Sequence, residues 1–178
     1  MPNSQLDTFQ GGNGLERFED DEEEDEEVEA ELEALFALAQ VDAEVAVAYE
    51  IVAQDVDEPT VRDRLLEFAQ EHHRHVDEIG AYLKAQGVEP AAAIPDPETS
   101  GVATLANALS AISPDAGMRS LSASEYFSNA AYAALLEVVG DSPARALIER
   151  SMADEHRHAR WLAEHPDIES AVAEARPQ

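Results

Sequence analysis

Apolar residues recur every three or four positions in four long stretches of the chain, which is the spacing of one face of an α-helix. The pattern predicts helices at about residues 29–54, 59–86, 119–139 and 143–164. Each helix would turn its apolar face toward the others, because burial of that face stabilises the fold. The sequence therefore predicts an all-α fold.

Two tight turns and one long connection separate the expected helices. Prolines within residues 55–59 and 140–143 stop one helix and start the next, so each turn predicts a helical hairpin. Residues 88–117 carry repeated Pro and Gly around one short helix expected at residues 102–112. A connection of this length is expected to cross the domain. The expected architecture is a four-helix bundle of two helical hairpins joined by a long crossover.

Both ends of the chain are expected to lie outside this bundle. Residues 1–28 are predicted to form a disordered acidic tail, since residues 1–15 show no periodicity and residues 16–33 contain 13 acidic side chains and one Arg. The bundle is expected over residues 29–166, and a short C-terminal tail over residues 167–178.

The net charge is −28 at pH 7, from 39 acidic and 11 basic side chains. Phosphate binding requires Lys and Arg, so we expect neither nucleic acid nor a membrane as a partner. Lys84 is the only lysine, and an acidic, lysine-poor composition is typical of halophilic proteins from a high-salt cytoplasm. No run approaches the roughly 18 apolar residues of a membrane span, so we expect a soluble, cytoplasmic protein. The absence of cysteine excludes disulfides and thiolate metal sites.

Histidines interrupt the apolar faces of two of the expected helices. The segment Asp-Glu-His-Arg-His near the C-terminal end aligns with Glu-His-His-Arg-His 83 residues earlier. Residues three apart share a helix face, so Glu155 and His158 point the same way, as do His72 and His75. Carboxylates and imidazoles gathered on inward faces can bind a metal ion.

The same 83-residue offset pairs Asp42 with Glu125 and Tyr49 with Tyr132. Counting outward from the first turn places Asp42 level with His72 and His75, with Glu44 as an alternative to Asp42. The same count from the second turn places Glu125 level with the pair of Glu155 and His158. We interpret the two tyrosines as core residues with satisfied hydroxyls, and a hydrogen bond to a ligand or a radical role is the alternative. The predicted metal ligands are Asp42, His72, His75, Glu125, Glu155 and His158.

This ligand layer resembles the di-metal site of the ferritin-like superfamily, which includes rubrerythrin and bacterioferritin. Two of its helices each give a carboxylate, and the other two each give a Glu-x-x-His pair. The resemblance covers about residues 30–165. It implies a four-helix bundle that holds two iron ions per chain, with manganese or zinc as alternatives, and that reacts with dioxygen or peroxide.

One position departs from the family pattern. His72 stands where the family has a glutamate that bridges the two metals through its two oxygens. Glu71 lies four residues before His75 and offers a replacement carboxylate. Arg74 and Arg157 are expected to pair with acidic residues of a neighbouring helix.

The expected function is oxidation of Fe²⁺ by dioxygen or peroxide, in iron or oxidative-stress handling, by a ferroxidase- or peroxidase-type oxidoreductase. No catalytic residue is expected apart from the metal ligands. The alternative is a non-enzymatic, stress-associated bundle with a vestigial metal site. A single zinc bound by His72, His75 and His158 for hydrolysis is a third hypothesis. A homodimer is compatible with the sequence.

Overall fold

The computed structural model describes residues 15–88 and 100–175, and over these residues it contains six helices and no strand. The predicted all-α class is thereby confirmed. Residues 1–14 of the expected N-terminal tail, residues 89–99 of the expected crossover and residues 176–178 lie outside the described residues. The helices are α1 (Leu15–Gln54), α2 (Pro59–Ala85), α3 (Gly101–Ser110), α4 (Pro114–Val138), α5 (Arg145–Glu164) and α6 (Ile168–Ala175).

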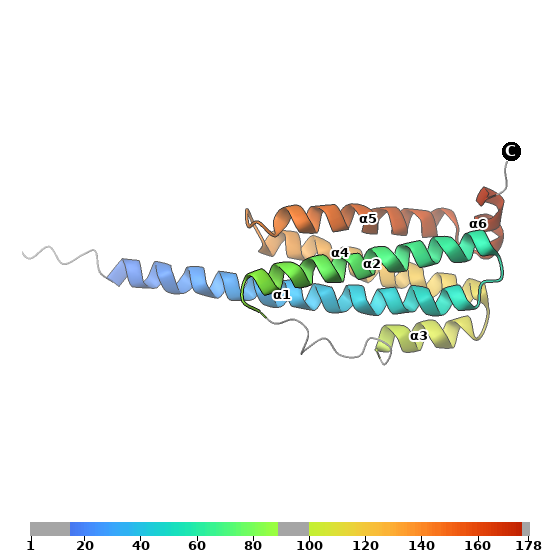
Figure 1. Cartoon of the computed structure of the whole chain (residues 1–178), viewed down its shortest axis with the longest axis horizontal. Coiled ribbons are helices and arrows are strands. Elements are labelled where there is room, and N and C mark those ends of the chain that lie inside the picture. The colour runs from blue at the N-terminus through green and yellow to red at the C-terminus, as the bar shows by residue number, and fades with distance from the viewer. Residues whose placement is uncertain (1–14, 89–99, 176–178) are drawn as a thin grey trace, which may run out of the picture.

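The four long helices run side by side along the longest axis of the molecule (Figure 1). Helix α1 packs against α2 and α4, and α5 packs against α4 and α2. The shorter α3 lies against α1 and α4. Its residues match the short helix expected at residues 102–112. Helix α6 contacts α2 and α4 at the end of the molecule where α5 finishes (Figure 1). Every long helix therefore turns one face toward a common interior.

Helix α4 begins earlier than the apolar pattern indicated. The backbone N–H of Ala116 donates to the Ser113 hydroxyl at 3.1 Å, which caps the helix. Pro114 occupies the first turn, where its missing N–H breaks no helical hydrogen bond. The helix thus starts at Pro114 instead of near residue 119.

The first and last helices extend into the segments expected to be tails. Helix α1 begins at Leu15, so the backbone of residues 15–28, expected to belong to the tail, is helical. Glu is a good helix former and no Gly or Pro interrupts the segment, so its composition favours a helix. Helix α6 lies within the expected C-terminal tail and buries Ala171 in the core. Its apolar residues form a helix because they can pack against the bundle.

Two apolar clusters fill the interior, and a polar layer separates them along every long helix. The Phe68 cluster includes Val45, Tyr49, Leu65, Phe68, Leu121 and Leu162. The Leu35 cluster includes Leu35, Leu38, Ile79, Tyr132, Leu135 and Ile148. The six predicted ligands lie between them in sequence on each helix, and all six are fully buried. The apolar clusters thus close both ends of the polar layer and shield it from water.

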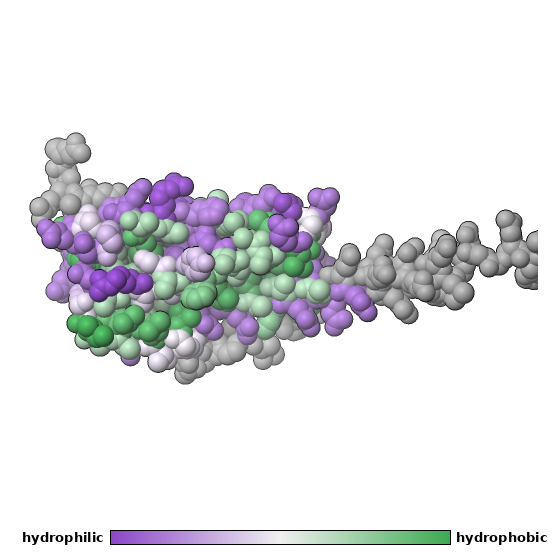
Figure 2. Space-filling model, turned by 180° about the vertical axis from the view of Figure 1, so that it is seen from behind, coloured by the Kyte–Doolittle hydropathy of each residue, from purple (hydrophilic) through white to green (hydrophobic). Residues whose placement is uncertain are grey.

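The surface is less uniformly charged than the net charge of −28 suggests. Figure 2 shows hydrophobic residues over much of one face, between hydrophilic margins. The large exposed apolar side chains include Tyr126 and Phe127 of α4, which are 73% and 69% exposed. Among the residues that the structure describes, no helix combines the length and apolar character that a membrane span requires.

Candidate metal centre

The structure brings all six predicted ligands together in two overlapping groups. The Asp42 group contains Asp42, His72, His75 and Glu155. The Glu125 group contains His72, Glu125, Glu155 and His158. His72 and Glu155 belong to both groups, whereas Glu44, the alternative to Asp42, belongs to neither.

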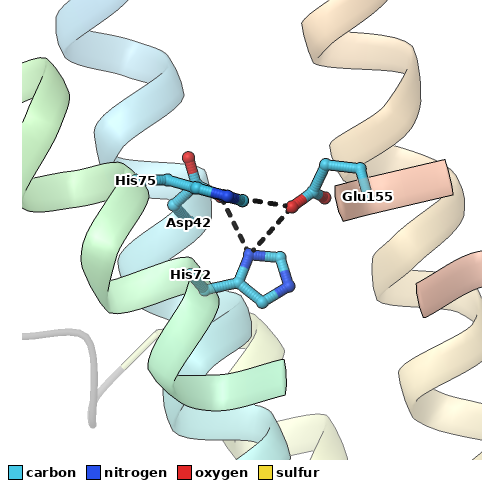
Figure 3. A group of neighbouring side chains, drawn as sticks. All are labelled: Asp42, His72, His75 and Glu155. Atoms are coloured by element: carbon cyan, nitrogen blue, oxygen red, sulfur yellow. Dashed lines mark hydrogen bonds and ion pairs between the residues drawn. The ribbon is translucent and has the colours of Figure 1, made fainter. Parts of the chain in front are cut away.

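The Asp42 group converges on one point from helices α1, α2 and α5 (Figure 3). Nδ1 of His72 lies 2.8 Å from Oδ1 of Asp42, and Nδ1 of His75 lies 3.4 Å from the same oxygen. Both Nδ1 atoms lie 3.3 Å from Oε1 of Glu155. Adjacent ligand atoms bound to one metal at about 2.0–2.2 Å lie roughly 3.0–3.5 Å from one another. The Asp42 group therefore has the separations of a four-atom ligand shell.

The Glu125 group has the same composition but is wider. Nε2 of His72 lies 3.2 Å from Oε1 of Glu125, and Nδ1 of His158 lies 3.4 Å from that oxygen. Nδ1 of His158 is 4.0 Å from Oε1 of Glu155, wider than the spacing of adjacent ligands on one ion. The two groups thus differ in how tightly their inward atoms converge.

Two inward-facing atoms of the layer have no hydrogen-bond partner. Oε1 of Glu155 and Nδ1 of His158 are buried and unsatisfied, although each lies within ion-pair distance of its neighbours. A buried polar atom left without a partner costs about 1–3 kcal/mol. A divalent cation would satisfy both atoms, and imidazole with carboxylate is a ligand set that iron, manganese and zinc accept. The residues present therefore fit a divalent metal ion.

Opposite charges in the layer overcome the effect of burial on the pKa values. Burial lowers the pKa of His75, but Asp42 and Glu155 raise it to about 9. Burial likewise lowers the pKa of His72, but the three carboxylates of the layer raise it well above its usual range. Burial raises the pKa of Glu125, but the neighbouring histidines lower it to about 2. At neutral pH the metal-free layer therefore holds Asp42 and Glu125 ionised and keeps His72 and His75 protonated, and a metal ion would displace a proton from each histidine.

Each facing carboxylate is held by a tyrosine from the other hairpin. The hydroxyl of Tyr49 donates to Oε1 of Glu125 at 2.6 Å, and the hydroxyl of Tyr132 donates to Oδ2 of Asp42 at 2.8 Å. Burial first, and then the nearby carboxylates, raise the pKa of both tyrosines, so both remain donors at neutral pH. Both tyrosines are fully buried members of the apolar clusters, so the interpretation as core residues with satisfied hydroxyls is confirmed, and the hydroxyl partners are two of the predicted ligands.

The outward nitrogens of two histidines contact carboxylates that also come from the other hairpin. Nε2 of His75 lies 3.4 Å from Oδ2 of Asp154, and Nε2 of His158 lies 2.6 Å from Oε2 of Glu71. When each Nε2–H donates outward, the Nδ1 lone pair points into the layer, ready to bind a metal. Asp154 and Glu71 are equivalent under the 83-residue offset, so these contacts repeat the exchange seen for the tyrosines.

Two arginines close this outer arrangement. Arg74 donates to Asp154, and Arg157 donates to both Glu71 and Asp154. The prediction that both arginines pair with acids of a neighbouring helix is confirmed, since Arg74 is on α2 with Asp154 on α5, and Arg157 is on α5 with Glu71 on α2. These ion pairs hold the carboxylates that orient His75 and His158.

The 83-residue symmetry is broken at several positions in and beside the layer, among them Asn129, whose side chain donates to the backbone oxygen of Glu125 and has Ala46 as its counterpart. His72 occupies the place equivalent to Glu155, and Val45 the place equivalent to Ser128. The Ser128 hydroxyl donates to Oε2 of Glu155, and this buried bond leaves only Oε1 directed into the layer without a partner. The sequence analysis missed Ser128, because serine is common on helix faces and the offset gives it no polar counterpart.

No family model, curated protein or solved structure matches this chain. The interpretation of the site therefore depends on its own geometry. That geometry can hold a divalent cation in a dry interior, with carboxylates and imidazoles already oriented by buried hydrogen bonds.

Proposed function

We propose that this protein is a ferritin-like four-helix bundle that binds divalent metal in its buried layer and oxidises Fe²⁺ with dioxygen or peroxide. The observation that carries the proposal is the pair of unsatisfied inward atoms, Oε1 of Glu155 and Nδ1 of His158, in a buried ligand layer. The residues that would hold metal are Asp42, His72, His75, Glu125, Glu155 and His158. Such a reaction serves iron or oxidative-stress handling.

The arrangement of the helices supports the ferritin-like part of the proposal. Helices α1 and α2 form one pair and α4 and α5 another, with a long segment containing α3 between the pairs. The contacts exchanged between the pairs follow one 83-residue offset, from Tyr49 and Tyr132 to Glu71 and Asp154. A bundle with one carboxylate on each of two helices and a pair of ligands on each of the others is the di-metal pattern of that superfamily.

A bound transition metal supplies the electron transfer that these side chains lack. The reaction balances when two Fe²⁺ ions lose one electron each and dioxygen takes both with two protons to become hydrogen peroxide. Peroxide as oxidant takes two electrons and two protons and becomes two water molecules. The Phe68 and Leu35 clusters exclude bulk water from the layer. The tyrosines and outer carboxylates hold the ligands in place, so little reorganisation is needed when metal binds.

Metal analysis and Fe²⁺ oxidation test this proposal directly. Protein purified without chelator should carry metal by elemental analysis, and metal-free protein should bind Fe²⁺ under anaerobic conditions and then form Fe³⁺ faster than buffer when oxygen is added. The His75→Gln substitution should lower the affinity for Fe²⁺ by about tenfold or more. His73→Gln is the matched control, because His73 is half-exposed and pairs with Glu50 outside the layer. Protein that contains no metal and binds no Fe²⁺ would contradict the proposal.

A non-enzymatic bundle with a vestigial site is the second candidate, and one observation favours it. Carboxylates surround His72 and raise its pKa well above the usual range, so a protonated His72 can balance part of the charge without a metal. The melting temperature distinguishes the two candidates, since a ligand bound only to the folded state at 100 times its Kd adds about 2.7 kcal/mol of stability. A chelator should lower the melting temperature if metal is bound, and should leave it unchanged in a vestigial site.

A further inference from the structure

His72 lies between the two ligand groups and directs one ring nitrogen into each. Nδ1 lies 2.8 Å from Oδ1 of Asp42, whereas Nε2 lies 3.2 Å from Oε1 of Glu125. The ring is fully buried and contacts a carboxylate through both nitrogens. It is therefore the only imidazole of the layer whose two nitrogens are divided between the two groups.

A neutral imidazole has one lone pair and one N–H, so it can give a ligand atom to only one group at a time. When Nδ1 of His72 binds a metal in the Asp42 group, Nε2–H donates to Glu125. The other shared residue, Glu155, adds no nitrogen to the second group; its Oε2 accepts the Ser128 hydroxyl, and its Oε1 lies in the layer without a hydrogen-bond partner. The second group is then left without a nitrogen from His72.

The separations between ligand atoms show which of the two groups is better arranged to bind one ion. The ligand atoms of the Asp42 group lie 2.8 to 3.4 Å from their printed neighbours, as bound ligands do. In the Glu125 group, Nδ1 of His158 is 4.0 Å from Oε1 of Glu155. Bringing those atoms to the spacing of adjacent ligands on one ion requires side-chain movement in a packed interior, which costs free energy.

We infer that the chain binds one divalent ion tightly in the Asp42 group, and that the Glu125 group is a weaker second site that holds the Fe²⁺ substrate transiently. His72 is the residue that makes the two sites unequal, since it serves the first and donates a hydrogen bond toward the second. This inference rests on the proposed function, because both require that the layer binds metal. It goes beyond that function by separating a resident ion from an exchanging one.

Titration of the metal-free full chain with Co²⁺ tests this inference without any enzymatic assay. The expected result is one tightly bound Co²⁺ per chain by equilibrium dialysis, with a second ion bound at least about tenfold more weakly. Four-coordinate Co²⁺ absorbs visible light much more strongly than the six-coordinate aqueous ion, so absorption should rise mainly with the first equivalent.

Two variants related by the 83-residue offset provide a matched comparison. His75→Gln should lose the tight Co²⁺ site, with its Kd raised about tenfold or more, whereas His158→Gln should keep that site and weaken only the second ion. His72→Glu replaces the divided imidazole by a carboxylate with two usable oxygens and should bring the two Co²⁺ affinities close together. Circular dichroism checks that each variant is folded, and the His75 and His158 pair decides the question if His72→Glu is not.

Several outcomes would overturn the inference. Two Co²⁺ ions of equal affinity in the unaltered chain would contradict unequal sites while leaving the proposed function intact. Equal losses in the His75→Gln and His158→Gln variants would do the same, as would loss of the tight site in His158→Gln alone. A chain that binds no Co²⁺ and no Fe²⁺ would contradict the proposed function itself.

Discussion

The two hairpins, α1 with α2 and α4 with α5, share a set of exchanged contacts around the polar layer but differ at several residues within it. Each gives a tyrosine to the other's carboxylate and an outer carboxylate to the other's histidine. The first hairpin has His72 and Val45 where the second has Glu155 and Ser128. The tyrosine and outer-carboxylate contacts are present in both hairpins although His72 replaces the carboxylate found at Glu155. These contacts therefore do not depend on which residue occupies that position.

The largest expected effect comes from Glu155, the carboxylate common to both groups. Glu155→Gln removes a negative charge and an inward oxygen from each group, so we expect the affinity for the first Co²⁺ to fall by about 100-fold or more. Glu125→Gln, in contrast, should leave the first ion bound, because Glu125 belongs only to the wider group. Chelator competition measures both affinities.

The control for this prediction is Glu50→Gln, since Glu50 is partly exposed and pairs with His73 outside the layer. Its Co²⁺ affinity should match that of the unaltered chain. Equal weakening in the Glu125→Gln and Glu155→Gln variants would contradict the division into two unequal groups.

An intermediate effect is expected from the two tyrosines. Tyr132→Phe removes the donor to Asp42 and should weaken the tight Co²⁺ site by about tenfold. Tyr49→Phe removes the donor to Glu125 and should leave the tight site unchanged. Both should lower the free energy of unfolding of the metal-free chain by about 1–3 kcal/mol, because each leaves a buried carboxylate with one donor fewer.

Urea unfolding measures these stabilities, and Co²⁺ titration measures the affinities. If both variants weakened the tight site alike, the exchanged hydrogen bonds would not distinguish the two groups. If neither variant lost stability, the two hydroxyl hydrogen bonds would contribute nothing to the free energy of unfolding.

The mildest perturbation is a change of pH without any substitution, which alters metal binding in the Asp42 group. The raised pKa of His75, about 9, means that the metal-free side chain holds two ring protons at pH 7 and must lose the Nδ1 proton to bind metal. Loss of the His75 proton alone should therefore raise Co²⁺ affinity by up to about tenfold per pH unit between pH 7 and 9. For the metal-free fold the sign is opposite: protonated His75 stabilises it fully below the unfolded pKa of about 6.5, and that stabilisation is lost as pH rises through about 9.

Calorimetric titration in two buffers of different ionisation enthalpy measures the released protons. His75→Gln should release fewer protons than the unaltered chain for any ion that it still binds. Proton release that is the same in both would show that His75 is not the group displaced by the metal.

The sequence predicted the long helices and the ligand layer because both depend on local spacing. A histidine or carboxylate in an apolar seam stands out, so His72, Glu125 and Glu155 could be found by counting along helices. The contacts of Glu71 with His158 and of Asp154 with His75 could not be found by counting, because they depend on the distance between α2 and α5. The full length of α1 was missed for another reason: strong charge favours a tail by composition, although Glu also favours helix.

Anomalous X-ray diffraction from crystals of the chain loaded with one equivalent of Co²⁺ tests the central claim most directly. We predict one strong peak, bounded by Nδ1 of His72, Nδ1 of His75 and the carboxylates of Asp42 and Glu155, with Nε2 of His72 donating to Glu125. Two equal peaks, or a single peak beside His158, would contradict unequal sites divided by His72. No peak anywhere in the layer would contradict the metal centre itself.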